Sequence, residues 1–144
     1  FRYDEAVSTG RGLQGRLAAI GSTAGLGAFM FASAIGPTRA LLERFVLPKP
    51  GEGPSPEAQR TGFFDLRFFG RTDDGKVIRA KVTGDRDPGY GSTAKMLGEA
   101  AACLAFDVEK TERGGGFWTP STIFGERLLA RLTSRAGLTF EVAD

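Results

Sequence analysis

Residues 64–82, FDLRFFGRTDDGKVIRAKV, contain two runs in which apolar and polar side chains alternate. Alternation with a period of two places the apolar side chains of a strand on one face. The apolar positions are Phe64, Leu66 and Phe68 in the first run, and Ile78, Ala80 and Val82 in the second. Asp74-Gly75 lies between the runs, and glycine supplies the positive φ that a tight turn requires. The sequence therefore predicts an antiparallel β-hairpin.

The opposite face of this hairpin carries Asp65, Arg67, Arg79 and Lys81. Exposed strands commonly carry opposite charges that pair across the sheet. The pattern predicts a solvated face with cross-strand charge pairs, and the wall of a binding site is the alternative.

Two helices and a strand are expected after the hairpin. Ser92 is predicted to cap a helix over 92–105, and Thr119-Pro120 to begin a helix over 120–135, because proline is favoured at the first helical position. Gly137 then ends the helix and 138–142 forms the last strand. The positions expected to face the core are Met96, Leu97, Ala100, Ala101, Cys103 and Leu104, then Phe124, Leu128 and Leu132. We expect an α+β fold with an antiparallel sheet covered on one face by helices.

Residues 1–47 are predicted to contain a strand over 1–10 that turns at Gly10 and Gly12, and then an apolar helical segment. No charge occurs over 17–38, LAAIGSTAGLGAFMFASAIGPT, a length that spans a bilayer. Four glycines weaken its insertion, so a helix buried against protein is the first interpretation and a membrane contact the second. A short helix over 39–46 follows. Residues 48–60 are rich in proline and glycine and are predicted to form an extended loop before an α+β part over 61–144.

Composition excludes several kinds of site. The 144 residues hold no histidine and a single cysteine, Cys103, so zinc ligation and histidine base catalysis are not expected. Cys103 is expected in the core. A formal charge of +2 is too small for the basic field of a nucleic-acid-binding protein. Acid–base chemistry would have to use tyrosine, lysine or carboxyl groups.

Three segments carry a resemblance to a known family. They are 63–72, FFDLRFFGRT; 82–105, VTGDRDPGYGSTAKMLGEAAACLA; and 114–142, GGGFWTPSTIFGERLLARLTSRAGLTFEV. In order and spacing they resemble the C-terminal half of the saccharopine-dehydrogenase-like oxidoreductases, including the group called trans-acting enoyl reductases. The resemblance covers about residues 39–142, and the loop PKPGEGPSPEA over 48–58 is similar too.

This resemblance implies an NAD(P)-dependent oxidoreductase whose Rossmann domain precedes the present sequence. Since the sequence starts at Phe1 within an expected strand, we treat it as a fragment. No G-x-G-x-x-G in a strand–turn–helix context is recognised, so the fragment alone is expected to be inactive and to bind no cofactor. The expected role is a substrate-binding and dimerisation domain with an acyl-lipid substrate. The rival role is a non-catalytic module for membrane association or oligomerisation.

Two loops hold the candidate site residues. Tyr90 and Lys95 are the candidate catalytic pair, since a phenol near an ammonium can protonate or orient a carbonyl. Gly89, Ser92 and Thr93 are candidates for holding a carboxylate or phosphate at a helix N-terminus. In the alternative interpretation Tyr90 only packs and Lys95 pairs with Glu99.

The second loop places Trp118 and Thr119 as candidates for contact with a lipid-like substrate, and a packing role is again the alternative. The expected partners are the chain's own Rossmann domain and a second copy of the chain, with membrane contact through 17–38 as a further possibility and no nucleic acid. The expected location is the cytoplasm, with or without membrane association. Asp87 and Arg86 are interpreted as exposed loop charges.

Overall fold

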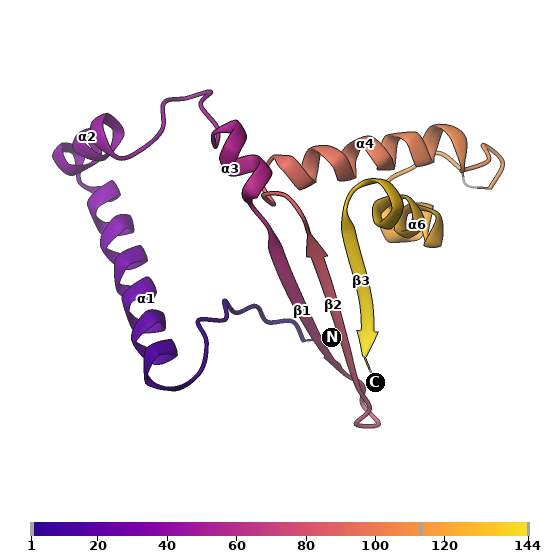
Figure 1. The fold of residues 1–144 in the computed structure, drawn as a ribbon, viewed down its shortest axis with the longest axis horizontal. Helices are drawn as coiled ribbons and strands as arrows, with labels where there is room; N and C mark the ends of the chain where they lie inside the picture. Colours follow the sequence, from indigo (N-terminus) through magenta and orange to yellow (C-terminus); the bar gives the residue numbers. More distant parts are fainter. Residues whose placement is uncertain (1, 113, 144) are drawn as a thin grey trace. The chain divides into compact units, whose positions relative to one another are not determined.

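The computed structural model describes residues 2–112 and 114–143 and divides into two compact units, 1–52 and 53–144. The first contains α1 (Gly12–Ala34) and α2 (Gly36–Phe45). The second contains α3 (Pro56–Thr61), β1 (Phe64–Arg71), β2 (Val77–Gly84), α4 (Gly91–Phe106), α5 (Pro120–Phe124), α6 (Glu126–Arg135) and β3 (Leu138–Ala143). Figure 1 shows their order along the chain.

The predicted hairpin forms the centre of the sheet. The three strands lie in the order β1-β2-β3, and both pairings are antiparallel. Gly75 has a φ of 84°, the left-handed conformation expected at the turn. Leu66 pairs with Val82, and Val82 with Phe140, so the apolar positions of all three strands share one face. The predicted α+β class, with helices on one side of an antiparallel sheet, is confirmed.

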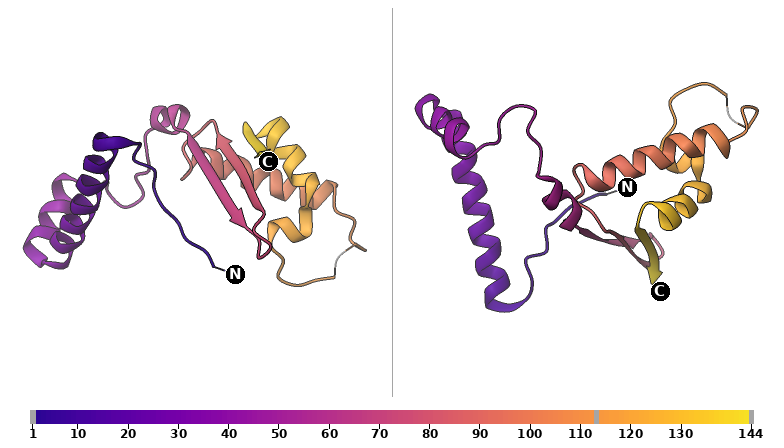
Figure 2. Two further views of the ribbon diagram at one scale, coloured as in Figure 1. Left: turned by 90° about the horizontal axis from the view of Figure 1, so that it is seen from below. Right: turned by 45° about the horizontal axis from the view of Figure 1, so that its top comes forward.

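The core lies where this apolar face meets α4 and α6, which pack against each other (Figures 1 and 2). Its buried side chains are Cys103, Leu128, Leu132, Ala136 and Leu138. Phe64 packs against them from β1, next to Gly84, where its ring leaves no room for a side chain. The helices therefore cover only the end of the sheet formed by Phe64, Gly84 and Leu138.

The rest of the apolar face has no cover within the described part of the second unit. It is formed by five side chains that are between 37 and 76 % exposed, namely Leu66, Phe68, Ile78, Phe140 and Val142. We call these five residues the open sheet face. Because monomeric proteins rarely leave large contiguous apolar surface in water, this face is a candidate for contact with another structure.

The polar face of the hairpin carries one of the predicted cross-strand charge pairs, Asp65 with Lys81, and a second pair within β1, Asp65 with Arg67. The Asp65 carboxylate accepts two hydrogen bonds from Arg67 at 3.2 Å and lies 3.9 Å from the Lys81 ammonium. These exposed pairs contribute little to stability but keep this face in water.

Some predictions for 1–61 are wrong. Residues 2–10 form no strand, since a short mixed segment needs a hydrogen-bonded neighbour and no strand pairs with it; Phe1 lies outside the described residues. The apolar helix begins at Gly12 and breaks at Ile35, because Pro37 starts a new helix. The predicted loop over 48–60 contains the short helix α3, whose first turn the Ser55 hydroxyl caps by accepting a hydrogen bond from Ala58 N at 3.1 Å.

Other corrections concern the two later helices. Met96, Ala100 and Cys103 face the core, but Leu97 and Leu104 are 70 and 52 % exposed, and Ala101 is exposed too. The helix expected over 120–135 is divided at Gly125, where φ is 53°. Ser92 lies inside α4 and does not cap it.

Candidate functional site

The loop between β2 and α4 is organised around Asp87. The Asp87 carboxylate accepts hydrogen bonds from the backbone N–H of Tyr90 at 3.0 Å and of Gly91 at 2.6 Å. It therefore binds two of the N–H groups at the start of α4, as an N-terminal capping residue does. Sequence reasoning missed this role. The available signal was an aspartate followed by proline and glycine just before a helix.

Close packing against α3 fixes the same loop. Asp87 N donates to the Gln59 carbonyl at 3.1 Å, and a side chain added at Gly62 would meet the Asp87 backbone at 2.7 Å. A side chain at Gly91 would meet the Arg86 Cβ at 2.9 Å. Glycine is required at both positions because of this close approach. Arg86 and Asp87, which were interpreted from the sequence as exposed loop charges, are half-buried.

Ser92 and Thr93, expected to hold an anion, have partners within the loop. The buried Ser92 hydroxyl donates to the Arg86 carbonyl at 3.2 Å, and the Thr93 hydroxyl donates to the Pro88 carbonyl at 2.6 Å. Ser92 N donates to the Asp87 carbonyl at 2.9 Å. These hydrogen bonds hold the loop on the first turn of α4, and the Asp87 carboxylate lies where an anion would have to bind.

Lys95 connects three elements of the second unit. Its ammonium donates to both carboxylate oxygens of Asp85, at 2.9 and 3.1 Å, and to the Ala136 carbonyl at 3.2 Å. Asp85 in turn lies over Gly137, where an added Cβ would be 2.4 Å from its carboxylate. The positive charge of Lys95 thus compensates the partial negative charge at the C-terminal end of α6. The alternative pairing with Glu99 is wrong, because Glu99 binds Arg131.

Tyr90 lies at the N-terminal end of α4, and its side chain is 56 % exposed. Its ring lies against Gly53, where an added Cβ would be 3.3 Å from the ring carbon that bears the hydroxyl. The Asp87 carboxylate fixes its backbone. The structure therefore presents an accessible phenol on a rigid turn, while the partners of Lys95 are Asp85 and Ala136.

The fit of a dinucleotide cofactor can be tested at this loop. Gly89 to Ala94, which follow β2 and include the first turn of α4, read Gly-x-Gly-x-x-Ala, a variant of the pyrophosphate-binding turn. That turn binds pyrophosphate with free N–H groups at the helix start, but here the N–H groups of Tyr90 and Gly91 bind the Asp87 carboxylate, whose negative charge repels phosphate. Gly21, Gly25 and Gly27 lie inside α1 and follow no strand. These residues do not fit a nicotinamide dinucleotide.

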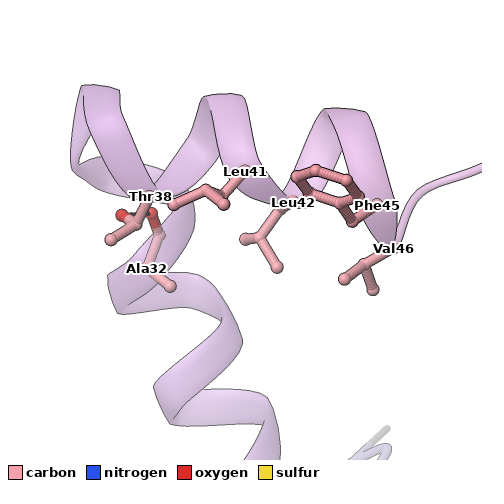
Figure 3. Close-up of a pocket in the computed structure, with 6 residues that line it drawn as sticks. All are labelled: Ala32, Thr38, Leu41, Leu42, Phe45 and Val46. Atoms are coloured by element: carbon pink, nitrogen blue, oxygen red, sulfur yellow. Dashed lines mark hydrogen bonds between the residues drawn. The ribbon is translucent and has the colours of Figure 1, made fainter.

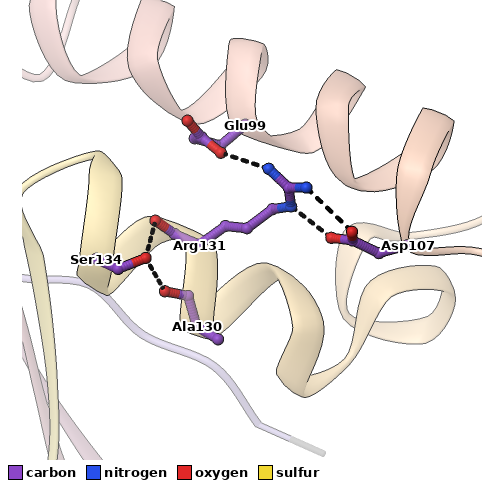
Figure 4. Close-up of polar contacts among 5 residues, drawn as sticks. All are labelled: Glu99, Asp107, Ala130, Arg131 and Ser134. Atoms are coloured by element: carbon purple, nitrogen blue, oxygen red, sulfur yellow. Dashed lines mark hydrogen bonds and ion pairs between the residues drawn. The ribbon is translucent and has the colours of Figure 1, made fainter.

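A mostly buried ionic cluster joins α4 to α6 (Figure 4). The Arg131 guanidinium donates to Asp107 through Nε and through Nη2, the latter at 3.0 Å, and to Glu99 through Nη1 at 3.1 Å. The hydrogen bonds from Arg131 lower the pKa of the Asp107 carboxyl, and those to Asp107 and Glu99 raise the pKa of Arg131. Burial, and then Asp107, raise the pKa of the Cys103 thiol. A thiol with a raised pKa is a poor nucleophile, so Cys103 belongs to the core as expected.

Trp118 and Thr119 lie just before α5. The Trp118 indole N–H donates to the Gly114 carbonyl at 3.1 Å, and the side chain is 43 % exposed. Thr119 occupies the N-cap position before Pro120, as predicted, and its hydroxyl bonds to those of Ser121 and Thr122. Phe117 is fully exposed beside them. Arg113 lies outside the described residues.

Comparison with known proteins gives a consistent set of relatives. A trans-acting enoyl reductase of Mycobacterium ulcerans is 38 % identical over 138 residues, which is 92 % of this chain and 32 % of the relative. The chain is similar to part of the trans-acting enoyl reductases. A protein of that name from Mycobacterium tuberculosis is 35 % identical with the same coverage, and another relative from that species matches 98 % of the chain.

The chain spans about a third of the length of these curated relatives. No protein-family model matches it, and no solved structure does either.

Proposed function

We propose that this chain is the substrate-binding and dimerisation part of an NAD(P)-dependent enoyl reductase of the saccharopine-dehydrogenase-like kind, with an acyl-lipid substrate. The proposal is supported by the similarity to trans-acting enoyl reductases over almost the full chain. Because neither of the two glycine-rich segments fits the pyrophosphate of the cofactor, a Rossmann domain in the same protein would bind it. This division of labour is common in dehydrogenases built from two domains.

The open sheet face is the observation that supports the proposed role in dimerisation. Its five apolar side chains continue the core of the second unit beyond the edge of α4 and α6. In an isolated domain the contact of this apolar surface with water would be unfavourable. A second copy that covers the face would stabilise the reductase, and replacing a central residue with a charge, as in Phe68→Glu, would weaken that contact.

Tyr90 is the residue that we propose for the chemistry. Reduction of an enoyl group adds a hydride to one carbon of the double bond and a proton to the other, so the site needs a proton donor. Tyr90 offers an exposed phenol whose backbone is fixed by Asp87. Lys95 would act indirectly, by fixing the first turn of α4 against Asp85 and Ala136.

The first experiment is calorimetric titration of NADPH and NADH into a full-length reductase that contains this sequence, with the 144-residue chain beside it. We expect binding to the full-length protein alone. Absence of binding to both would reject the oxidoreductase assignment and leave an assembly role. Binding to the short chain would contradict our conclusion about the Asp87 loop.

Turnover of the Tyr90→Phe protein then tests the proton donor. We expect a lower kcat with an unchanged unfolding midpoint, since the ring and its packing on Gly53 are retained. Tyr3→Phe, which removes the hydroxyl of the chain's other tyrosine outside this loop, is the control and should not change turnover. Full activity of Tyr90→Phe would remove Tyr90 from the mechanism.

A further inference from the structure

The first unit has an unusual distribution of apolar surface. α1 has 23 residues, its sequence from Leu17 onward carries no charge, and none of its membrane-length window is buried. Leu17, Ile20 and Leu26 are 60, 66 and 62 % exposed, and Met30 and Phe31 are 65 and 70 % exposed. At 1.5 Å per residue the helix is about 35 Å long, slightly more than the ~30 Å hydrocarbon layer of a bilayer. A helix that is apolar on all sides is typical of a non-aqueous environment.

The junction after α1 provides partners for the polar groups that a lipid environment would leave unsatisfied. The Thr38 hydroxyl donates to the Ala32 carbonyl and, at 3.0 Å, to the Ile35 carbonyl. Ser33 donates to the Phe29 carbonyl at 2.7 Å. Backbone carbonyls at a helix end are costly in lipid unless they are bonded internally. This helix end is therefore compatible with the edge of a hydrocarbon layer.

α2 differs from α1 because it has two distinct sides. Leu41, Leu42, Phe45 and Val46 line, with Ala32 and Thr38, a shallow apolar hollow of about 270 Å³ (Figure 3). Arg39, Glu43 and Arg44 supply the charges of the same helix, and the Arg44 guanidinium lies 5.4 Å from the centre of the Phe45 ring. An amphipathic helix with an aromatic residue and arginines is typical of the lipid–water interface.

The charged residues that flank the uncharged segment are mostly basic. Arg11 and Arg16 lie before the uncharged segment, and Arg39, Arg44 and Lys49 lie after it. Glu43 is the single acidic residue between Arg11 and Lys49, so this stretch has a net charge of +4. Basic residues at the ends of an apolar helix attract the head groups of anionic lipids.

We propose that α1 and α2 form a lipid-docking element, in which α1 enters the hydrocarbon of an anionic bilayer and α2 lies in its interface. The proposal does not depend on the enoyl reductase assignment, because it uses residues of the first unit alone. A docked α1 would hold the rest of the protein beside a lipid phase.

The test is flotation of the 144-residue chain with vesicles of phosphatidylcholine containing about a third phosphatidylglycerol. We expect the chain to float with these vesicles, and less with phosphatidylcholine alone or in high salt. Leu26→Asp places a charge at the middle of α1 and should weaken binding by roughly a hundredfold. Leu97→Asp is the matched control, because Leu97 is a similarly exposed helix residue of the second unit, and it should bind like the wild type.

A second measurement does not depend on the stability of the Leu26→Asp helix. An environment-sensitive dye on Met30→Cys should shift to the blue when anionic vesicles are added, and the buried Cys103 should not compete for the dye. An unshifted dye, or equal flotation of wild type and Leu26→Asp, overturns the proposal. So does a stable lipid-free dimer held by α1, with no vesicle binding, since Gly21 and Gly25 would then serve helix pairing.

Discussion

Replacement of Leu132 by alanine should destabilise the second unit strongly. Leu132 is 7 % exposed and belongs to a core with five buried apolar side chains among the described residues. Full burial of a leucine side chain contributes about 1.5–3 kcal/mol, and the cavity left behind adds to the loss. We therefore expect the free energy of unfolding to fall by about 3 kcal/mol. In a unit of this size, that change corresponds to a decrease in Tm of more than about 10 °C.

Leu129→Ala is the matched control, because Leu129 lies in the same helix but is 43 % exposed. The two substitutions change helix propensity equally, so the difference between them reports burial. We expect Leu129→Ala to cost about 1 kcal/mol or less. Urea unfolding can be followed through the single tryptophan, Trp118, which lies in the second unit. Equal midpoints for the two variants would refute the core described here.

Two further predictions concern carboxylates. Asp87→Ala should lower the free energy of unfolding by about 1 kcal/mol, since α4 loses its N-terminal cap, and an unchanged urea midpoint would show that the cap contributes nothing. Arg131 lowers the pKa of Asp107 below its ordinary value of 3.8, so the carboxylate stabilises the fold above that pH and ceases to do so as the pH falls through the lower pKa of the folded state. Asp107→Asn should therefore be less stable than the wild type at pH 7 and equally stable well below pH 3.8. Urea unfolding at both pH values measures this difference in stability, and a difference that persists at the lower pH would contradict the prediction.

Parts of the second unit could be predicted from the sequence, because apolar and polar residues alternate along its strands and turn-forming residues lie between its elements. The period-two pattern over 64–82 and Asp74-Gly75 predicted the hairpin and its apolar face. The positive φ of Gly137 and the start of α5 after Thr119 also followed from local chemistry. These features depend on neighbouring residues in the chain, so a short window of sequence contains the necessary information.

Helix orientation could not be obtained in the same way. Leu97 and Leu104 fit an apolar stripe as well as Met96 and Cys103 do, yet the contact with α6 buries one set and exposes the other. The partners of Lys95 also come from distant positions, since the Ala136 carbonyl is 41 residues away. A local rule suggested Glu99, one turn away, but Arg131 approaches from α6 and binds it.

By itself, the sequence determined the α+β class, the hairpin, the buried Cys103 and the likeness to one family, because periodicity, turn residues and segment order are properties of the chain. The tertiary structure decided that Asp87 occupies the start of α4, that Lys95 binds Asp85 and Ala136, and that the sheet keeps an open apolar face. Each of these depends on packing between elements, where distances of a few ångströms determine which polar groups pair and which apolar side chains stay in water.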